Sequence, residues 1–284
     1  MFKIIAKSLL ATMLFTGMGV SAFANEGGEL RLEHVKWKFN GMFGTYDRPA
    51  MQRGYQVYKE VCSSCHALEH LSFRHLGEKG GPFYSERFPN PNDNPDIKAF
   101  AKDWEVPDID GDSGDAITRL GIPSDKFPRI YENPIAASAS NGGAIPPDLS
   151  LITMARSGGA DYVYSILTGY HEEPPHDFQL SEGMHYNDAF ANNQIKMAQP
   201  LYDGSVEYAP INITDEHGKI IETIAAPEAT LEQMARDVTE FLAWAGDPKM
   251  EVRKKVGFAT FLYLFILALL LFMTYKHVWR NVKH

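Results

Sequence analysis

The chain has 284 residues, of which 44% are hydrophobic and 22% charged. This composition fits one sizeable globular domain or two small ones, and it excludes a disordered tail and a multi-span membrane protein. Residues 25–250 contain 19 Lys and Arg against 35 Asp and Glu, a net charge of −16. Such a field repels nucleic acid and attracts basic partners, so nucleic-acid binding is excluded. Two cysteines are too few for a disulfide framework.

Two apolar segments bracket the acidic part of the chain. In residues 1–24, Lys3 and Lys7 precede an apolar run that ends in the small-x-small pattern of Ala22 and Ala24, as in a cleaved secretory signal peptide. Residues 256–275 contain no charged side chain. At about 1.5 Å per residue, a helix of this length crosses a hydrocarbon core of about 30 Å.

The orientation of this span follows from the signal peptide, because basic residues flank the span on both sides. We expect residues 25–250 to form an exported domain on the periplasmic side of a bacterial cytoplasmic membrane. Residues 251–284 are expected to form a single-pass anchor with a short cytoplasmic tail.

The fold class expected for the exported part is mainly α with long loops. Glycine and proline are frequent, and strand patterns are weak. The helix at 230–245 starts with a capping box of Thr230 and Gln233 and stops at Gly246. In chain order we expect a helix at 49–66, mostly loop at 77–148 with a short helix near 97–104, short helices at 148–156 and 161–168, irregular chain at 170–215, a short strand at 219–225, and the helix at 230–245.

The strongest motif is Cys62-Ser63-Ser64-Cys65-His66, the C-x-x-C-H signature of haem c attachment. Two thiols about one turn apart can each add across a vinyl group of one porphyrin. The imidazole that follows is then placed against the iron as an axial ligand. We therefore expect one covalent haem c on this chain.

Other uses of two cysteines fit less well. A dithiol oxidoreductase has a strand before its C-x-x-C, whereas the run before Cys62 has helical spacing. A disulfide closing so short a loop removes little chain entropy, and zinc would need further ligands at the right spacing.

The sixth iron ligand is left open by the pattern alone. Thioether sulfur raises the potential of a haem, and an open site would permit ligand chemistry. Met234 lies on an apolar helix face and is expected in the core, and Met154 is in a helical pattern. Met184 and Met197 both lie in irregular chain, and either can reach an iron.

A close helix crossing is expected as well. Gly54 and Tyr58 lie on the helix that leads into the haem motif, and Phe241 and Trp244 lie on the last helix before the span. In c-type cytochromes the first and last helices cross, and a glycine lets their backbones approach.

The sequence resembles the cytochrome c1 family, the c-type haem subunit of the ubiquinol–cytochrome c oxidoreductase (cytochrome bc1) complex, in its bacterial form. The resemblance covers the chain from about Trp37 onward. It rests on the order and spacing of six stretches: 58–66 (YKEVCSSCH), 73–76 (FRHL), 141–150 (NGGAIPPDLS), 161–164 (DYVY), 167–170 (LTGY) and 195–198 (IKMA).

The resemblance implies a role for each matching site residue. Cys62 and Cys65 carry the porphyrin, and His66 and Met197 are the axial iron ligands. Arg156 pairs with a haem propionate and Tyr162 is a pocket aromatic at the same edge. Asn141, Pro146 and Pro147 form the wall on the His66 side, where a backbone carbonyl fixes the imidazole tautomer.

The implied function is one-electron transfer from a Rieske iron–sulfur protein to a soluble or membrane-anchored cytochrome c. The chain is then not an enzyme by itself. It is an electron-transfer subunit of a proton-translocating respiratory or photosynthetic complex, which is dimeric and also contains cytochrome b. The alternative is a membrane-anchored, peroxidase-like haem enzyme with an open distal site.

An acidic stretch at 93–115 is the remaining feature. It contains eight Asp and Glu residues against Lys98 and Lys102. It is either a solvated loop or a surface that steers a basic cytochrome c.

Overall fold

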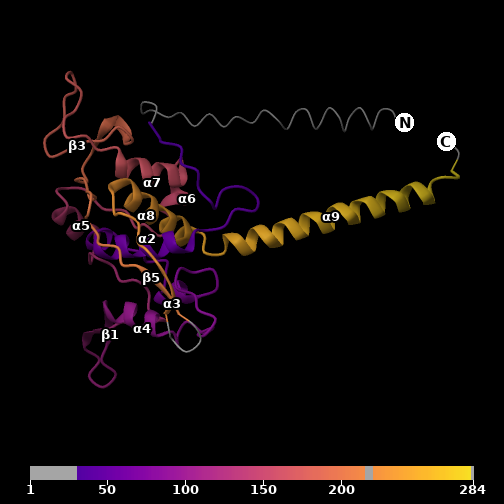
Figure 1. Ribbon diagram of the computed structural model, residues 1–284, viewed down its shortest axis with the longest axis horizontal. Helices are drawn as coiled ribbons and strands as arrows, with labels where there is room; N and C mark the ends of the chain where they lie inside the picture. Colours follow the sequence, from indigo (N-terminus) through magenta and orange to yellow (C-terminus); the bar gives the residue numbers. More distant parts are fainter. Residues whose placement is uncertain (1–30, 215–219, 283–284) are drawn as a thin grey trace.

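The computed structural model describes residues 31–214 and 220–282. Its helices gather in one domain, and α9 (Met250–Val278) projects from that domain as a long rod (Figure 1). The expected signal peptide, residues 1–24, lies outside the described residues. The strands of the described residues form two-stranded antiparallel pairs, so the fold is mainly α with long loops, as the sequence predicts.

Helix α2 (Arg48–Glu60) leads into the haem motif. Asp47 caps its start, and Pro49 occupies the first turn, where a missing N–H costs nothing. The helix is shorter than the predicted 49–66 and is followed by a 3₁₀ turn, η1 (Cys62–Ser64). The hydroxyls of Ser63 and Ser64 donate to the carbonyls of Lys59 and Val61. Such local bonds compete with helix continuation and explain the early end.

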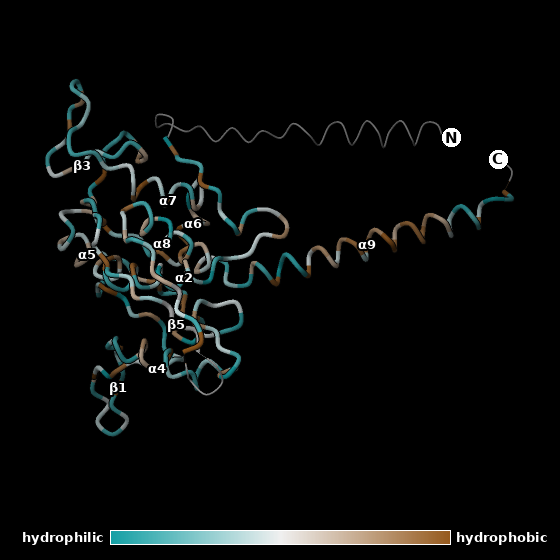
Figure 2. Tube along the Cα trace, viewed as in Figure 1, coloured by the Kyte–Doolittle hydropathy of each residue, from teal (hydrophilic) through white to brown (hydrophobic). Residues whose placement is uncertain are grey.

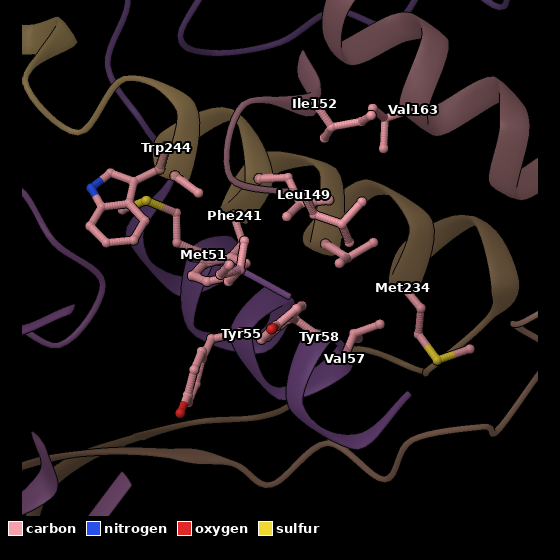
Figure 3. Close-up of a cluster of buried hydrophobic side chains, with 14 of the residues drawn as sticks. Met51, Tyr55, Val57, Tyr58, Leu149, Ile152, Val163, Met234, Phe241 and Trp244 are labelled. Atoms are coloured by element: carbon pink, nitrogen blue, oxygen red, sulfur yellow. The ribbon is translucent and has the colours of Figure 1, made fainter. Parts of the chain in front are cut away.

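Helix α8 (Leu231–Gly246) crosses α2 in the core. Thr230 caps it by accepting from the Gln233 N–H at 3.2 Å, and the helix ends at Gly246, as predicted. Figure 3 shows Phe241 and Trp244 of α8 against Met51, Tyr55 and Tyr58 of α2. Met234 is fully buried, which confirms its expected place in the core.

The crossing depends on Gly54, as the sequence predicts. A Cβ at this position would lie 2.0 Å from the backbone oxygen of Asp237 and 2.7 Å from Cβ of Phe241. Beside it, the Arg53 guanidinium makes two hydrogen bonds to the buried Asp237 carboxylate, at 2.7 and 2.8 Å. Glu240 is 4% exposed and accepts from the Asp47 N–H at 2.8 Å. The crossing is therefore both close and polar.

Helices α6 (Ile152–Ala155) and α7 (Gly159–Thr168) pack on the other side of α8. α6 is only the second half of the predicted helix at 148–156. The Asp161 carboxylate accepts from the Val35 N–H at 3.2 Å and from Nε1 of Trp37 at 2.7 Å. These bonds fasten the segment before α2 to α7.

The region 77–148 contains more structure than the predicted loop. α3 (Phe73–Gly77) precedes it, and α4 (Pro95–Lys102) begins two residues before the predicted 97–104. β1 (Glu105–Ile109) and β2 (Ala116–Leu120) form a hairpin with Val106 opposite Arg119. α5 (Pro134–Ser140) follows. The hairpin and α5 were not predicted.

Two further antiparallel pairs lie in the second half of the chain. β3 (His185–Tyr186) pairs with β4 (Gln194–Ile195) across the short turn η2 (Ala191–Asn193), inside the region predicted to be irregular. β5 (Ile211–Thr214) pairs with β6 (Ile220–Ile224), which confirms the strand predicted at 219–225.

Helix α9 is long and apolar enough to cross a membrane, and Figure 2 shows its hydrophobic middle flanked by hydrophilic ends. Its first turns are fastened to the domain. The Tyr46 N–H donates to the Glu251 carboxylate at 2.9 Å, and the Tyr46 hydroxyl donates to the carbonyls of Ala243 and Asp247. Lys249 pairs with Glu78 at 2.9 Å. The membrane-spanning helix is thus bonded directly to the globular domain.

Candidate haem site

The haem motif forms a tight turn after α2. The backbone N–H groups of Cys65 and His66 both donate to the Cys62 carbonyl, at 3.2 and 2.9 Å. Both thiols are free and half-buried. Burial raises the pKa of the Cys62 thiol to about 12. A redox dithiol needs a lowered thiol pKa, so this environment argues against a dithiol oxidoreductase.

The imidazole of His66 is held in one tautomer. Its Nδ1 lies 2.8 Å from the carbonyl oxygen of Pro147. A carbonyl only accepts, so Nδ1 carries the proton and Nε2 presents a lone pair. Burial also lowers the pKa of His66, which favours the neutral ring. This geometry suits a metal ligand, and the carbonyl comes from the Pro146-Pro147 segment, as expected.

Further hydrogen bonds hold the chain after His66 against the chain after Pro147. The Leu149 N–H donates to the Ala67 carbonyl at 2.9 Å, and the Glu69 N–H donates to the Asp148 carboxylate at 2.8 Å. The Tyr58 hydroxyl donates to the His66 carbonyl at 3.1 Å. The sequence pattern does not predict this role for Tyr58, because a tyrosine on an apolar helix face is typical of an ordinary core.

The loop that follows α5 contacts the segment that contains Met197. Asn141 closes α5 by donating to the Ala137 carbonyl at 2.6 Å. A Cβ on Gly142 would lie 3.1 Å from Cε of Lys196, and a Cβ on Gly183 would lie 2.8 Å from its Nζ. The Lys196 side chain therefore lies between these two loops, directly before Met197.

Met197 itself is half-buried just after β4. The Tyr170 hydroxyl donates to its backbone carbonyl at 2.9 Å. Met184 is also half-buried, just before β3 of the same pair. Met154 is 66% exposed on α6. Tyr170 lies in a stretch predicted to be irregular, so no local pattern predicts its hydrogen bond to Met197.

Arg156 and Tyr162 lie together, as the resemblance implies. Burial raises the pKa of the Tyr162 hydroxyl, and the Arg156 guanidinium beside it partly opposes that rise. Arg156 is exposed directly after α6, and Tyr162 is half-buried on α7. The pair thus places a cation next to a phenol.

The segment that holds His66 also carries exposed apolar side chains, namely Ile145, Leu151 and Met154. Exposed large apolar side chains near a polar anchor are typical of a site for an apolar ligand. Two free thiols, a neutral imidazole with a free Nε2 and this apolar surface together fit a haem.

Comparison with known proteins identifies the family. The Cytochrome C1 family matches residues 37–282. The chain belongs to the cytochrome c1 family. It is 36% identical to cytochrome c1 of Rhodospirillum rubrum, with all of both chains covered. It is 39% identical to the mitochondrial cytochrome c1 heme protein of Saccharomyces cerevisiae, over 87% of this chain and 72% of that protein.

A longer relative is also similar. The chain is 42% identical to the protein named cytochrome b/c1 of Bradyrhizobium diazoefficiens, over 95% of this chain, but it spans only 39% of that protein's length. Membership of the cytochrome c1 family makes the chain an electron-transfer haem protein, as expected, and gives no support to the peroxidase-like alternative. With α9, it fits a single-pass membrane protein.

Proposed function

We propose that this chain carries one haem c, bound covalently through Cys62 and Cys65, and passes single electrons from a Rieske iron–sulfur protein to a cytochrome c. The single observation that carries the proposal is the hydrogen bond between His66 and Pro147. It leaves Nε2 of His66 free, so this residue would hold the haem iron next to the two thiols that would carry the porphyrin. A bound haem supplies an iron that changes its oxidation state by one electron.

The thiols attach the group without any oxidant. Each S–H bond adds across one vinyl double bond, so the sulfur joins one carbon and the hydrogen joins the other. The 3₁₀ turn between Cys62 and Cys65 holds both sulfurs on the same short segment. The Tyr58 hydroxyl and the Pro147 carbonyl then fix the backbone and the ring of His66, which limits rearrangement when the charge changes.

Met197 is the proposed second axial ligand. Two contacts near Met197 support this assignment. The Lys196 side chain lies against the loop at Gly142, and the Tyr170 hydroxyl donates to the Met197 carbonyl. Arg156 and Tyr162 are proposed to hold a propionate, because a guanidinium is the side chain best suited to a carboxylate. Asn141, Pro146 and Pro147 are proposed as the wall on the His66 side.

The proposed setting is the ubiquinol–cytochrome c oxidoreductase complex, a proton-translocating assembly that is dimeric by family resemblance. One relative is named for both cytochrome b and c1, and another is named as a subunit of the cytochrome b-c1 complex in Candida albicans. Both names support cytochrome b as a neighbour. The predicted signal peptide supports a bacterial cytoplasmic membrane with the haem domain on the periplasmic side.

The mature protein purified from its own membranes tests the attachment. An alkaline pyridine spectrum is expected to be that of a c-type haem, and the colour is expected to stay with the chain on a denaturing gel. The intact mass is expected to equal the processed chain plus one haem. A colourless chain with two titratable thiols would refute the proposal.

A pair of matched variants tests the second ligand. Met197→Leu is expected to keep the covalent haem but lower its midpoint potential, because the thioether ligand is lost. Met184→Leu, next to the neighbouring strand β3 of the same antiparallel pair, is expected to leave the potential unchanged. The assay is a redox titration of both variants. The opposite pattern would assign the iron to Met184.

A further inference from the structure

A small closed loop lies beside the first turns of α9, indigo in Figure 1. The Thr45 N–H donates to the Lys38 carbonyl at 3.2 Å and closes the 38–45 loop, and the Gly44 N–H donates to the Gly41 carbonyl at 3.4 Å. Gly41 has φ +79°, which glycine adopts without strain. At the tip, Met42 is 62% exposed and Phe43 is 74% exposed. The loop therefore presents two large apolar side chains that the domain does not cover.

The base of the 38–45 loop is fixed to the start of α9. Nζ of Lys254 donates to the Phe39 carbonyl at 2.5 Å and to the Gly44 carbonyl at 3.4 Å. The Phe39 ring stacks on Trp37, with 5.4 Å between ring centroids, and also contacts Tyr46. Because both ends of the loop are held, its tip has a defined position relative to the helix.

That position is level with the membrane span. The Phe43 ring lies edge-on to Phe258 of α9, with 5.3 Å between ring centroids. Phe258 is the third residue of the uncharged segment 256–275, so it lies about 3 Å inside the start of that segment at 1.5 Å rise per residue. A side chain in contact with Phe258 is therefore at the edge of the hydrocarbon region.

The charge of this segment also suits a membrane surface. Between Glu33 and Asp47 the chain has no acidic residue and carries the exposed Lys36 and Lys38, of which Lys38 pairs with the Asp47 carboxylate. The rest of the domain is strongly acidic. Apolar side chains at the tip and the exposed Lys36 before the loop match the layering of acyl chains below phosphate headgroups.

We propose that the 38–45 loop enters the lipid–water interface on the side of the haem domain, with Met42 and Phe43 against acyl chains. The loop then gives the domain a second membrane contact beside α9. Continuity with the span favours lipid as the occupant, because a fixed tip at this depth meets the bilayer wherever no other protein displaces it.

Photo-crosslinking of the full chain in its native membrane tests this inference. The photoreactive residue p-benzoylphenylalanine replaces Phe43 in one variant and Met42 in a second. Phe261, which is 68% exposed within the uncharged segment of α9, is the positive control. Ile135, which is 81% exposed on α5, is the control for water. Adducts are identified by the mass of the chain after irradiation.

Phospholipid adducts at Phe43 and Met42 are expected at least tenfold above those at Ile135 and close to those at Phe261. Adducts with a neighbouring protein in place of lipid would overturn the proposal and place a subunit on the loop. A yield equal to that of Ile135 would also overturn it. Since the assay reads lipid and not haem, its result is independent of the proposed electron transfer.

Discussion

Replacing Gly54 with Ala tests the close crossing of α2 and α8. The added Cβ would lie 2.0 Å from a backbone oxygen and 2.7 Å from another Cβ, and neither atom is the end of a flexible side chain. Ala is better than Gly inside a helix by about 1 kcal/mol. Overpacking of a dense core costs about 3 kcal/mol at its upper end. The cost of overpacking exceeds the gain in helix propensity, so we expect the free energy of unfolding to fall by about 2 kcal/mol.

The assay is thermal unfolding of the full chain in detergent, followed by far-UV circular dichroism. For a domain of this size, 1 kcal/mol corresponds to about 2–4 °C, so the expected decrease in Tm is about 4–8 °C. Gly257→Ala is the matched control, because a Cβ at Gly257 of α9 meets nothing within 4 Å. A Gly54→Ala protein as stable as the parent would refute the crossing geometry.

Two further predictions concern charge. Burial raises the pKa of Glu240 to about 7. As the pH rises from about 4.5, the unfolded state therefore loses this proton before the folded state does. The free energy of unfolding is expected to fall by up to about 3 kcal/mol between pH 4.5 and 7. Glu240→Gln is expected to remove that slope in denaturant titrations at several pH values; an unchanged slope would contradict it. The double variant of Asp112 and Asp115 to Asn, at the exposed end of the β1–β2 hairpin, is expected to slow reduction of a basic cytochrome c about two- to tenfold at low salt and to flatten its salt dependence. Changing Glu172 and Glu173 to Gln alters the charge equally and is the control; equal effects of both pairs would make the acidic stretch a solvated loop.

The parts of the fold that were predictable from the sequence have strong local signals. Thr230 and Gly246 mark the ends of α8, and the apolar spacing before Cys62 marks α2. The close approach at Gly54 was also predictable, because only glycine lets two helix backbones meet. In each case one or two residues determine the local geometry.

The β1–β2 hairpin and α5 had weaker or misleading signals. The hairpin is exposed along most of both strands, so it lacks the apolar alternation of a half-buried strand. Its end is shaped by the Asp110 carboxylate, which accepts from the N–H groups of Asp112 and Ser113. Asn133-Pro134 looks like a turn, yet Asn133 caps α5 and Pro134 fills its first position. The same dipeptide, Asn94-Pro95, starts α4.

The haem motif is evident from the sequence, whereas the residues that contact the motif and the Met197 segment are not. Tyr58, Tyr170 and Lys196 act through contacts between segments that are distant along the chain. No local pattern reports such contacts. The roles of Arg156, Tyr162 and Asn141 came from family resemblance and stay predictions about haem contacts.

The joint between α8 and α9 limits how this carrier can work. Only residues 247–249 separate the two helices. The start of α9 is also bonded to the domain, because Lys249 pairs with Glu78, Lys254 donates to the Phe39 carbonyl and Glu251 accepts from the Tyr46 N–H. With so short a connection, the proposed haem would stay at one height above a bilayer crossed by α9. Under the proposed function, its electron donor and acceptor would then have to come to that height.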